Sequence, residues 1–402
     1  MSTVISTIDL GDIGFGEGAH LLLKHVLAQV RPGGRVAVTG SHPALTADVM
    51  AWCRARGHPA EAGTARPEDS VRAWVTRGLS ESYRWAGAER AGGPAPGQRV
   101  SEPSARWGLA ARGALVERGG PLATYQLSRE EQVWADLAPR LYAQAAAAQW
   151  DPATAVPWQA EFDVPDEIEA AVIQVMTFLI ENEQAALVLP ARFLTRIHPH
   201  FREVVQLLAV QAADEARHIE VFSRRAALSG RPLGTSTVSG RVSLFTLLSE
   251  PDFSLASFLL SVLGEGSFLS LLAFLDRYAP DQVTRTVARL AHQDEARHVA
   301  FGVAHLEHQA KVDTGLLPRL RSTVERRHEA LSGTSGLNED VFDALVLLAA
   351  GSWDPAAIAS GFAAVRDLEA DMYTGRVRRL TRLGFPPGEA AEISALHTRN
   401  FM

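Results

Sequence analysis

Two five-residue strings in the chain are identical, and both contain residue types that bind metal ions. They read Asp-Glu-Ala-Arg-His and occupy residues 214–218 and 294–298. Each places a glutamate three residues before a histidine, and residues three apart on an α-helix lie about 60° apart around the axis. One helix can therefore offer a carboxylate and an imidazole to the same ion. Such mixed oxygen and nitrogen ligation suits iron or manganese better than the metals that prefer thiolates.

Each string is preceded by an apolar, helix-like segment that contains an isolated acidic spot. The first segment, Val175 to Leu189, contains Glu183, and the second, Leu255 to Leu275, contains Glu265. A glutamate from each of two helices and Glu-x-x-His from each of two others form the ligand set of a two-metal four-helix bundle. We expect the two isolated glutamates to bridge the ions. The predicted ligands are Glu183, Glu215, His218, Glu265, Glu295 and His298.

The surroundings of the two strings repeat as well. The isolated glutamate precedes the glutamate of its string by 32 residues in the first half and by 30 in the second. A turn proline follows it after 16 residues in the first half (Pro199) and after 15 in the second (Pro280). This pattern predicts a duplicated helical hairpin, against the alternative of two charged stretches that match by chance. Glu181 is an alternative first ligand, but the distance from Glu183 to its proline agrees better with the second half.

Two acidic residues show how much the surroundings matter. Glu325 begins a third Glu-x-x-His, which ends at His328, but it lies in a charged run, and we interpret it as part of an exposed helix face. Glu265 lies in the middle of Ser254 to Leu275, a stretch apolar enough to resemble a membrane span. A buried carboxylate needs a cation or another partner, so a bundle helix that faces a metal explains Glu265 better than a membrane span does. We expect no other membrane-spanning segment.

The doubled string resembles the motif of soluble bacterial multicomponent monooxygenases, which belong to the ferritin-like superfamily of di-iron carboxylate oxygenases and oxidases. The resemblance covers about residues 165–309. It implies a ferritin-like bundle in which each string's aspartate orients a ligand histidine and its arginine holds the aspartate. These supporting residues would be Asp214, Arg217, Asp294 and Arg297.

Three positions separate the chain from related families. Phe222 follows the first histidine by four residues, where ribonucleotide reductase small subunits have a radical-bearing tyrosine, so we expect no stored tyrosyl radical. The single cysteine, Cys53, cannot form the four-cysteine iron centre of rubrerythrin-like peroxidases. His292 precedes Glu295 by three residues. It is either an additional ligand, as in di-iron N-oxygenases of arylamines, or a histidine of the core or of the layer around the ligands.

Composition favours a soluble cytoplasmic enzyme. The net charge is −7 with both signs interspersed, which excludes a basic surface for nucleic acid. One cysteine fits a reducing compartment. The first 18 residues lack the cationic and apolar regions of a secretory signal.

The first 80 residues differ from the rest in their sequence pattern. They alternate strand, helix, strand, helix and strand, which predicts a small α/β domain. The expected elements are Thr3–Leu10, Ala19–Val30, Arg35–Thr39, His42–Arg56 and Val71–Arg77. Residues 31–38 and the later Gly57-His58 resemble the small sulfur-carrier proteins of bacterial tRNA thiolation. The active cysteine of that family is missing from Gly14–Gly18, and we interpret Cys53 as a small buried residue. We therefore expect docking or substrate gating rather than sulfur transfer.

The predicted organisation continues with an irregular linker at 81–128, in which a short hairpin is expected around Gly119-Gly120. The di-metal bundle follows at 129–312, and helices at 313–402 are expected to pack on it or to form a dimer face. The fold class is thus mainly α, a ferritin-like four-helix bundle with extra C-terminal helices behind a small α/β domain.

The predicted function is a non-haem di-iron oxygenase or oxidase that uses O₂ to hydroxylate, N-oxygenate or desaturate a small organic substrate. The cofactor would be two iron ions, with manganese as the alternative. Phe222, Phe268 and Phe301 would line a dry pocket, or they are plain core residues. Expected partners are an electron donor such as a reductase or ferredoxin, a carrier protein and a second copy of the chain, without nucleic acid or membrane. Two alternatives remain open: a ferroxidase or metal-handling protein, and a bundle whose acidic residues are only structural.

Overall fold

The structure is a computed structural model of the 402-residue chain, and it describes residues 6–63, 71–95, 97–332 and 339–397. The chain forms two compact units. The first contains residues 1–96 and 110–122, and the second contains residues 97–109 and 123–402. Each unit has its own apolar core.

The first unit is a small α/β fold with a mixed four-stranded sheet. The strand order is β1-β2-β4-β3, with β1 parallel to β2 and with β4 antiparallel to both β2 and β3. The elements agree with the predicted order, apart from the additional short strand β3; the part of the first expected strand before residue 6 lies outside the described residues. The elements are β1 (Ser6–Asp9), η1 (Phe15–Glu17), α1 (Ala19–Gln29), β2 (Arg35–Thr39), α2 (Leu45–Arg56), β3 (Ala60–Ala62) and β4 (Val71–Thr76).

Cys53 is a residue of α2 and is buried in the core of this unit. Burial raises the pKa of its thiol to about 11, so the reactive thiolate is disfavoured. This confirms the interpretation of Cys53 as a small buried residue.

The hairpin expected around Gly119-Gly120 is wrong. Strand β6 (Leu115–Val116) pairs antiparallel with β5 (Glu89–Arg90), which comes before β6 in the chain and not after the Gly119-Gly120 turn. Both glycines have positive φ, but residues 117–127 form no strand that could return along β6. The short helix α3 (Ser80–Arg84) precedes β5.

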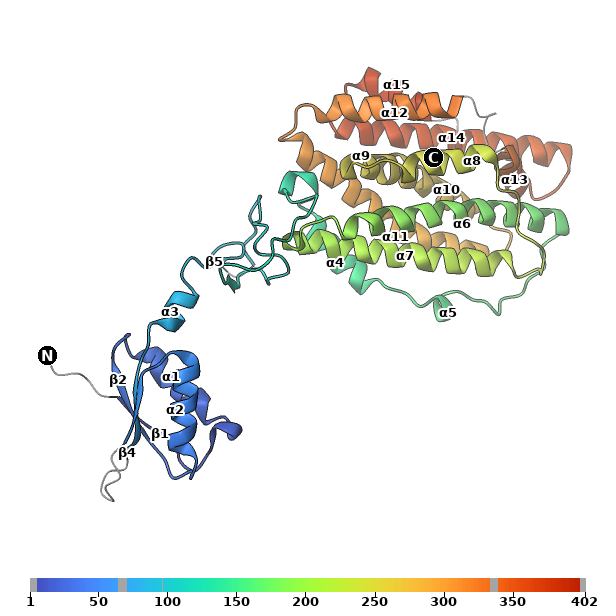
Figure 1. Ribbon diagram of the computed structural model, residues 1–402. Helices are drawn as coiled ribbons and strands as arrows, with labels where there is room; N and C mark the ends of the chain where they lie inside the picture. Colours follow the sequence, from blue (N-terminus) through green and yellow to red (C-terminus); the bar gives the residue numbers. More distant parts are fainter. Residues whose placement is uncertain (1–5, 64–70, 96, 333–338, 398–402) are drawn as a thin grey trace. The chain divides into compact units, whose positions relative to one another are not determined.

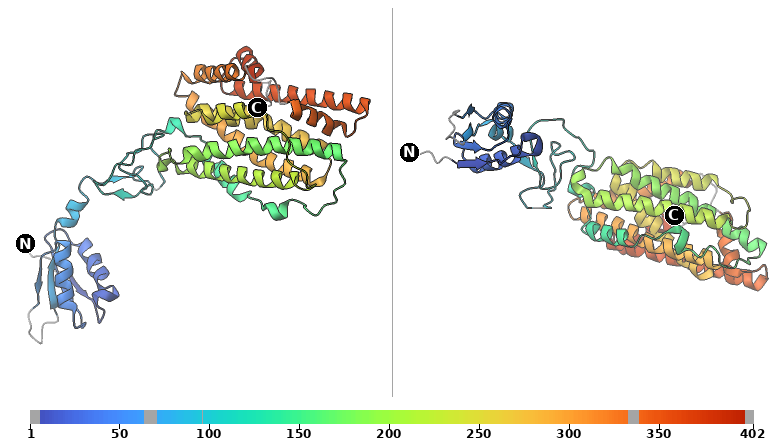
Figure 2. Two further views of the ribbon diagram at one scale, coloured as in Figure 1. Left: turned by 45° about the vertical axis from the view of Figure 1, so that its right-hand side comes forward. Right: turned by 90° about the horizontal axis from the view of Figure 1, so that it is seen from below.

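The second unit is built around four long helical segments, which confirms the predicted mainly α bundle. Helices α6 and α7 pack along each other and form one hairpin, and a segmented third helix packs against α11 to form the other (Figures 1 and 2). Contacts between α7 and α11 join the two hairpins. The segments are α6 (Asp166–Leu194), η3 (Pro199–Phe201), α7 (Arg202–Ala226), α9 (Phe253–Ser257), the π-helix η4 (Phe258–Glu265), α10 (Gly266–Tyr278) and α11 (Gln282–Ala310).

Local sequence explains where these helices begin. The Asp252 carboxylate accepts hydrogen bonds from the backbone N–H groups of Ser254 and Leu255 and caps α9. The Asp281 carboxylate accepts from the N–H of Thr284 and caps α11 directly after Pro280. Pro199 begins the short helix η3 between α6 and α7, so both turns predicted from proline are present.

The apolar core of the bundle is divided into two clusters, and the division occurs at the same level on every long helix. Along α6, one cluster ends at Ile180 and the other begins at Ala185; along α7, the break lies between Leu208 and Val221. The corresponding breaks fall between Leu263 and Phe268 and between Ala291 and Val299. Each interval contains predicted metal ligands, so a polar layer crosses an otherwise apolar bundle.

The remaining helices surround this bundle. Helix α13 packs on α6 and α14, α14 packs on α10, and α12 packs on α8 and α15. These helices, with three that precede α6, are η2 (Glu130–Gln132), α4 (Ala138–Ala147), α5 (Pro152–Ala155), α8 (Val238–Leu248), α12 (Leu316–Ser332), α13 (Glu339–Ala350), α14 (Pro355–Arg382) and α15 (Pro387–His397).

Within the described residues two helices, rather than the one predicted, are long and apolar enough to cross a membrane. They are Asp166–Leu194 and Phe253–Tyr278, and α13 with α14 would form a third, bent candidate. The most apolar stretch of the first helix is 72% buried inside the protein, and that of the second is 78% buried. Their apolar character is therefore used in packing the bundle.

Candidate metal centre

The six predicted ligands lie together in the polar layer of the bundle. Their ligand atoms form two groups, and within each group all atoms lie within 4.8 Å of one another. One group contains Glu183 and His218, the other contains Glu265 and His298, and both contain Glu215 and Glu295. The two string glutamates are therefore the residues placed to bridge two ions. This differs from the expectation that Glu183 and Glu265 would bridge.

The two histidines turn the same ring nitrogen towards the carboxylates. Nδ1 of His218 lies 3.0 Å from Glu215 Oε2, 3.6 Å from Glu295 Oε1 and 3.7 Å from Glu183 Oε2. Nδ1 of His298 lies 3.0 Å from Glu215 Oε1, 3.5 Å from Glu295 Oε2 and 3.9 Å from Glu265 Oε1. The carboxylates and both Nδ1 atoms thus converge on a small common volume.

Several of these buried atoms have no hydrogen-bond partner in the described part of the chain. They are Glu183 Oε1, Glu265 Oε2 and Glu295 Oε2. Buried polar atoms are normally paired, and three unpaired carboxylate oxygens in one cluster fit a pair of cations. The site is therefore able to bind two metal ions, which confirms the predicted two-metal cofactor.

Three of the ligand carboxylates, Glu183, Glu265 and Glu295, hold protons more tightly than usual when no cation is present. Burial, and then the charge of Glu215, raises the pKa of Glu183 to about 8. Burial also raises the pKa of Glu295, and burial together with the charge of Glu295 raises that of Glu265 well above its usual value. Burial alone would lower the pKa of His218, but its hydrogen bonds to Asp294, Glu183 and Glu215 raise it well above its usual value. Cations in the site would replace these protons.

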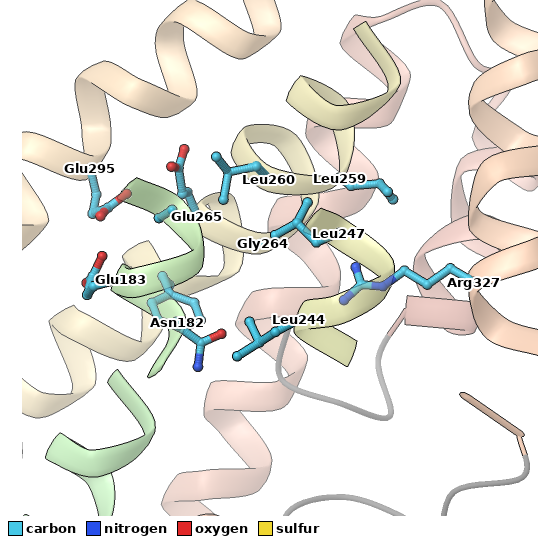
Figure 3. A pocket seen from close by; sticks show the side chains of 12 residues that line it. Asn182, Glu183, Leu244, Leu247, Leu259, Leu260, Gly264, Glu265, Glu295 and Arg327 are labelled. Carbon is cyan, nitrogen blue, oxygen red and sulfur yellow. The ribbon is translucent and has the colours of Figure 1, made fainter. Parts of the chain in front are cut away.

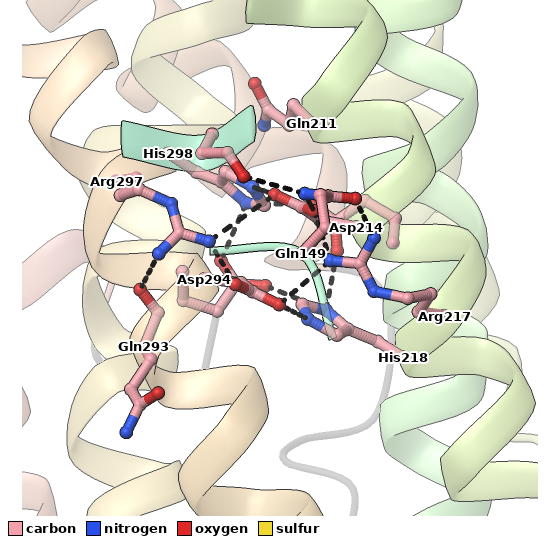
Figure 4. Close-up of polar contacts among 12 residues, drawn as sticks. Gln149, Gln211, Asp214, Arg217, His218, Gln293, Asp294, Arg297 and His298 are labelled. Carbon is pink, nitrogen blue, oxygen red and sulfur yellow. Dashed lines mark hydrogen bonds and ion pairs between the residues drawn. The ribbon is translucent and has the colours of Figure 1, made fainter. Parts of the chain in front are cut away.

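The aspartates of the two strings support the histidines crosswise (Figure 4). His218 Nε2 lies 3.2 Å from Asp294 Oδ2, and His298 Nε2 lies 3.2 Å from Asp214 Oδ2. Each aspartate therefore holds the histidine of the other string. A proton on Nε2 that is donated to the aspartate leaves Nδ1 free to bind a metal.

The arginines of the two strings tie the aspartates together. Arg217 donates to Asp214 Oδ1 and lies 3.4 Å from Asp294 Oδ2. Arg297 donates to Asp294 Oδ1 and lies 3.8 Å from Asp214 Oδ2. Burial opposes ionisation of both aspartates, but the hydrogen bonds from His298 and His218 hold the pKa of Asp214 and Asp294 below the usual value. The aspartates are therefore acceptors for the histidines.

Three supporting residues were missed by sequence reasoning. Gln149 donates to Asp214 Oδ1 at 2.9 Å, and Trp150 donates through Nε1 to Asp294 Oδ2 at 2.8 Å. These neighbours follow α4, outside the duplicated hairpins, so no repeat pointed to them. Gln211 donates to Glu265 Oε1 at 3.0 Å; its position one turn before Glu215 is a signal that could have been used.

The alternative ligands lie outside both groups. Glu181 and His292 are partly exposed, whereas Glu183 and Glu295 are buried. The interpretation of Glu325 as part of an exposed helix face is confirmed, because it pairs at 2.8 Å with Arg321 and half of its side chain is exposed. The neighbouring Arg327 departs from that interpretation, since it is buried.

A narrow cavity of about 30 Å³ adjoins the ligands (Figure 3). Phe268 lines it as expected, but Phe222 and Phe301 do not. The ring of Phe222 packs 6.2 Å from that of His218, and the ring of Phe301 stacks 6.2 Å from that of His305, so both are core residues. The lining residues are Asn182, Glu183, Ala186, Leu244, Leu247, Leu259, Leu260, Gly264, Glu265, Phe268, Glu295 and Arg327.

No protein-family model and no curated protein matches the sequence. Among solved structures, similar folds include R2-like ligand-binding oxidases. A variant with an aerobically reconstituted Mn/Fe cofactor is 15% identical, with a TM-score of 0.47 over 61% of this chain and 95% of its own. A variant with an Fe/Fe cofactor is 16% identical, with a TM-score of 0.45 over 61% and 94%. The enzyme from Sulfolobus acidocaldarius is 14% identical, with a TM-score of 0.40 over 63% and 94%. Similarity at this level assigns no function, and the chemistry proposed below follows from the side chains of the site.

Proposed function

We propose that the protein is an O₂-dependent oxidase or oxygenase with two metal ions, which hydroxylates, N-oxygenates or desaturates a small organic molecule. Glu183, His218, Glu265 and His298 would each hold one ion, and Glu215 and Glu295 would bridge both. The observation that carries the proposal is that this buried acidic site opens on a cavity with apolar walls. Iron is the preferred metal and manganese the alternative, because the donor set is carboxylate and imidazole.

The bound metals would supply the redox chemistry that activates O₂. The chain's own side chains set the conditions for it. Asp214 and Asp294 fix the two imidazoles, and Gln211 orients Glu265 on the cavity side. Leu259, Leu260 and Phe268 exclude water next to the ligands, which protects a reactive species from side reactions.

The apolar cavity favours oxidation of an organic molecule over ferroxidase activity, because iron ions alone would need a polar approach. The proposal includes an external electron donor, such as a reductase or ferredoxin, since the chain has one cysteine and no thiolate cluster to store electrons. A cytoplasmic location, a homodimer and docking of a carrier protein by the first unit remain predictions.

Metal analysis combined with oxygen uptake tests the proposal. Protein loaded anaerobically with ferrous iron should carry about two metals per chain. With a chemical reductant it should consume O₂ beyond the iron oxidised, and the excess should depend on an organic substrate. Uptake that scales only with added iron would instead indicate a ferroxidase. Protein that binds no metal under these conditions would contradict both functions.

A further inference from the structure

An arginine of helix α14 reaches the π-helix η4, which ends with the proposed ligand Glu265. Nε of Arg379 donates to the backbone carbonyl of Val262 at 2.7 Å, and α14 packs on both η4 and α10. Arg382 on the same helix pairs with Glu307, whereas no described carboxylate lies within ion-pair distance of Arg379. Burial lowers the pKa of Arg379 only to about 10, so the guanidinium stays charged near neutral pH. Burying part of this charge is costly, and the hydrogen bond to η4 offsets part of that cost.

Gly266 provides the room for this contact. It follows Glu265 directly, and a Cβ at Gly266 would lie 2.4 Å from Cζ and 2.5 Å from Nε of Arg379. A side chain at this position would therefore displace the guanidinium, and glycine permits the close approach. A second glycine, Gly302 of α11, meets Ser261 of η4 in the same way. The π-helix is thus held closely by two helices, α11 and α14.

A second arginine of α14 supports the same turn through a hydroxyl. Nη1 of Arg376 donates to Ser267 Oγ at 2.9 Å, and Ser267 Oγ donates to the backbone carbonyl of Leu263 at 2.7 Å. Nε of Arg376 also donates to Ser394 Oγ of α15 at 3.2 Å. The carbonyls of two consecutive residues of η4, Val262 and Leu263, are therefore bound by side chains.

The π-helical turn decides the direction in which Glu265 points. Successive side chains of an α-helix are about 100° apart around the axis, and the wider turn of a π-helix makes that angle smaller. Over η4, Phe258–Glu265, the two geometries therefore direct the last side chain differently. Residues 255–275 form an apolar run that fits an α-helix equally well, so contacts with other segments select the π-helical form.

We propose that Arg379 is a positioning residue of the metal centre: it holds the π-helical turn that directs the Glu265 carboxylate into the ligand group of His298. A charged donor suits this task, because its hydrogen bond to a carbonyl is stronger than that of a neutral group. Without the guanidinium, η4 would relax towards α-helical geometry and Glu265 would leave the group, whereas Glu183 on the regular helix α6 would stay in place. The inference rests on the proposed function, because it names a residue that positions a ligand of that site.

A comparison in two single-ligand backgrounds tests the inference on the full-length protein. Glu183→Ala keeps the ligand group of Glu265, and Glu265→Ala keeps the group of Glu183. Adding Arg379→Gln should weaken cobalt binding about tenfold or more in the first background and by less than about twofold in the second, because Arg379 acts through Glu265. Arg379→Lys should restore part of the affinity, since an ammonium can also donate to the carbonyl. The matched control is Arg378→Gln, an exposed residue of the same helix, which should change neither affinity.

Two further measurements check whether Arg379 acts by holding η4. Gly266→Ala keeps the arginine but displaces its guanidinium, so it should reproduce the weakening in the Glu183→Ala background. In metal-free protein, the backbone amides of residues 258–266 should exchange hydrogen faster in Arg379→Gln than in wild type or Arg378→Gln, because the turn loses its support. The exchange measurement needs neither metal nor turnover.

Several results would overturn the inference. These are an equal loss of affinity in both backgrounds, an unchanged affinity when Arg379→Gln is added to Glu183→Ala, or unchanged hydrogen exchange of η4. An equal loss would mean that Arg379 supports the bundle as a whole. Wild-type protein that binds no metal contradicts the proposed function, whereas protein that binds two metals and shows any of these results contradicts only the role of Arg379.

Discussion

The two halves of the metal centre contain the same five-residue string but present the opposing glutamate from different kinds of helix. In the first half, Glu183 lies on the regular α-helix α6. In the second half, Glu265 is the last residue of the π-helix η4. Four residues after the string histidine, the first half has Phe222, which fills the core beside His218, and the second half has Gly302. A Cβ at Gly302 would lie 2.4 Å from Cβ of Ser261 in η4.

This difference shows how one repeat can acquire an opening. The glycine lets the π-helix approach α11 closely, and π-helical turns are often found at functional sites. The cavity is lined by Leu259, Leu260, Gly264 and Glu265 of η4, but only by Asn182, Glu183 and Ala186 of α6. The duplicated strings supply the ligands, and the irregular half supplies the access.

The largest expected effect comes from a ligand that both halves share. Glu215→Ala should reduce the metal content from about two per chain towards zero and abolish oxygen uptake, because Glu215 belongs to both ligand groups. The matched control is Glu325→Ala, which should keep its metal and change stability by no more than about 0.5 kcal/mol. Elemental analysis decides the matter, and equal metal content in the two variants would refute the two-metal site.

Removing a ligand that belongs to one half should have a smaller effect on metal content. Glu183→Ala and Glu265→Ala should each retain about one metal per chain and lose turnover. Both glutamates line the cavity, so Glu265→Ala also changes its wall on the η4 side and Glu183→Ala on the α6 side. Metal titrations of both variants would show this, and loss of both ions in each variant would mean that the halves do not act separately.

The crosswise aspartates give a third test of the two halves. Asp214→Asn should weaken the ion held by His298, and Asp294→Asn should weaken the ion held by His218, each by about 10- to 100-fold. Spectra of protein loaded with a single cobalt equivalent would show which half is affected. If each variant weakened the ion of its own string instead, the crosswise contacts would not govern metal binding.

The close approach at Gly302 should be sensitive to a single methyl group. Gly302→Ala should lower the free energy of unfolding by about 1–3 kcal/mol, because the new Cβ meets the Ser261 side chain inside a packed core. Gly388→Ala is the control, since nothing lies within 4 Å of its added Cβ. Urea denaturation of both variants measures the difference, and an unchanged midpoint for Gly302→Ala would show that η4 can move away at little cost.

The smallest effect expected is a gradual dependence of stability on pH. The raised pKa of Glu183, about 8, and the raised pKa values of His218 and His298 mean that the metal-free folded protein binds more protons than the unfolded chain. Its stability should therefore fall as pH rises from about 5 to 8, by on the order of a few degrees in Tm. The metal-loaded protein should not show this fall, because cations replace the protons. Thermal melts of both forms measure this, and parallel pH profiles would contradict it.

The repeated part of the site was predictable from the sequence, and the unrepeated part was not. Glu215, His218, Glu295 and His298 are found by spacing alone, and helix periodicity then points to Glu183 and Glu265. Gln149 and Trp150 come from a segment with no counterpart in the repeat. Arg327 was hidden because its helix reads as charged, and burial of one side chain in such a run depends on which neighbours cover it. Local pattern fixes helices and their faces, whereas contacts between distant segments depend on packing.

The fold shows the same division. The order of strands and helices in the first unit follows from alternation and turn residues. The partner of β6 did not, because a two-residue strand carries almost no pattern of its own. The π-helix was also invisible, since an apolar run such as residues 255–275 fits an α-helix equally well.

The π-helix has a consequence for how the two ends of the cavity influence each other. Glu265 ends η4, Leu259 and Leu260 of η4 wall the cavity, and Arg379 binds the backbone carbonyl of Val262 within it. A molecule in the cavity that displaces this helix would therefore also shift the position of the Glu265 carboxylate. Binding linkage then requires reciprocity: whatever factor the metals add to the affinity for an organic substrate, that substrate must add to the affinity for the metals. A substrate that binds more tightly in the presence of the metals would thus also slow their loss from the protein.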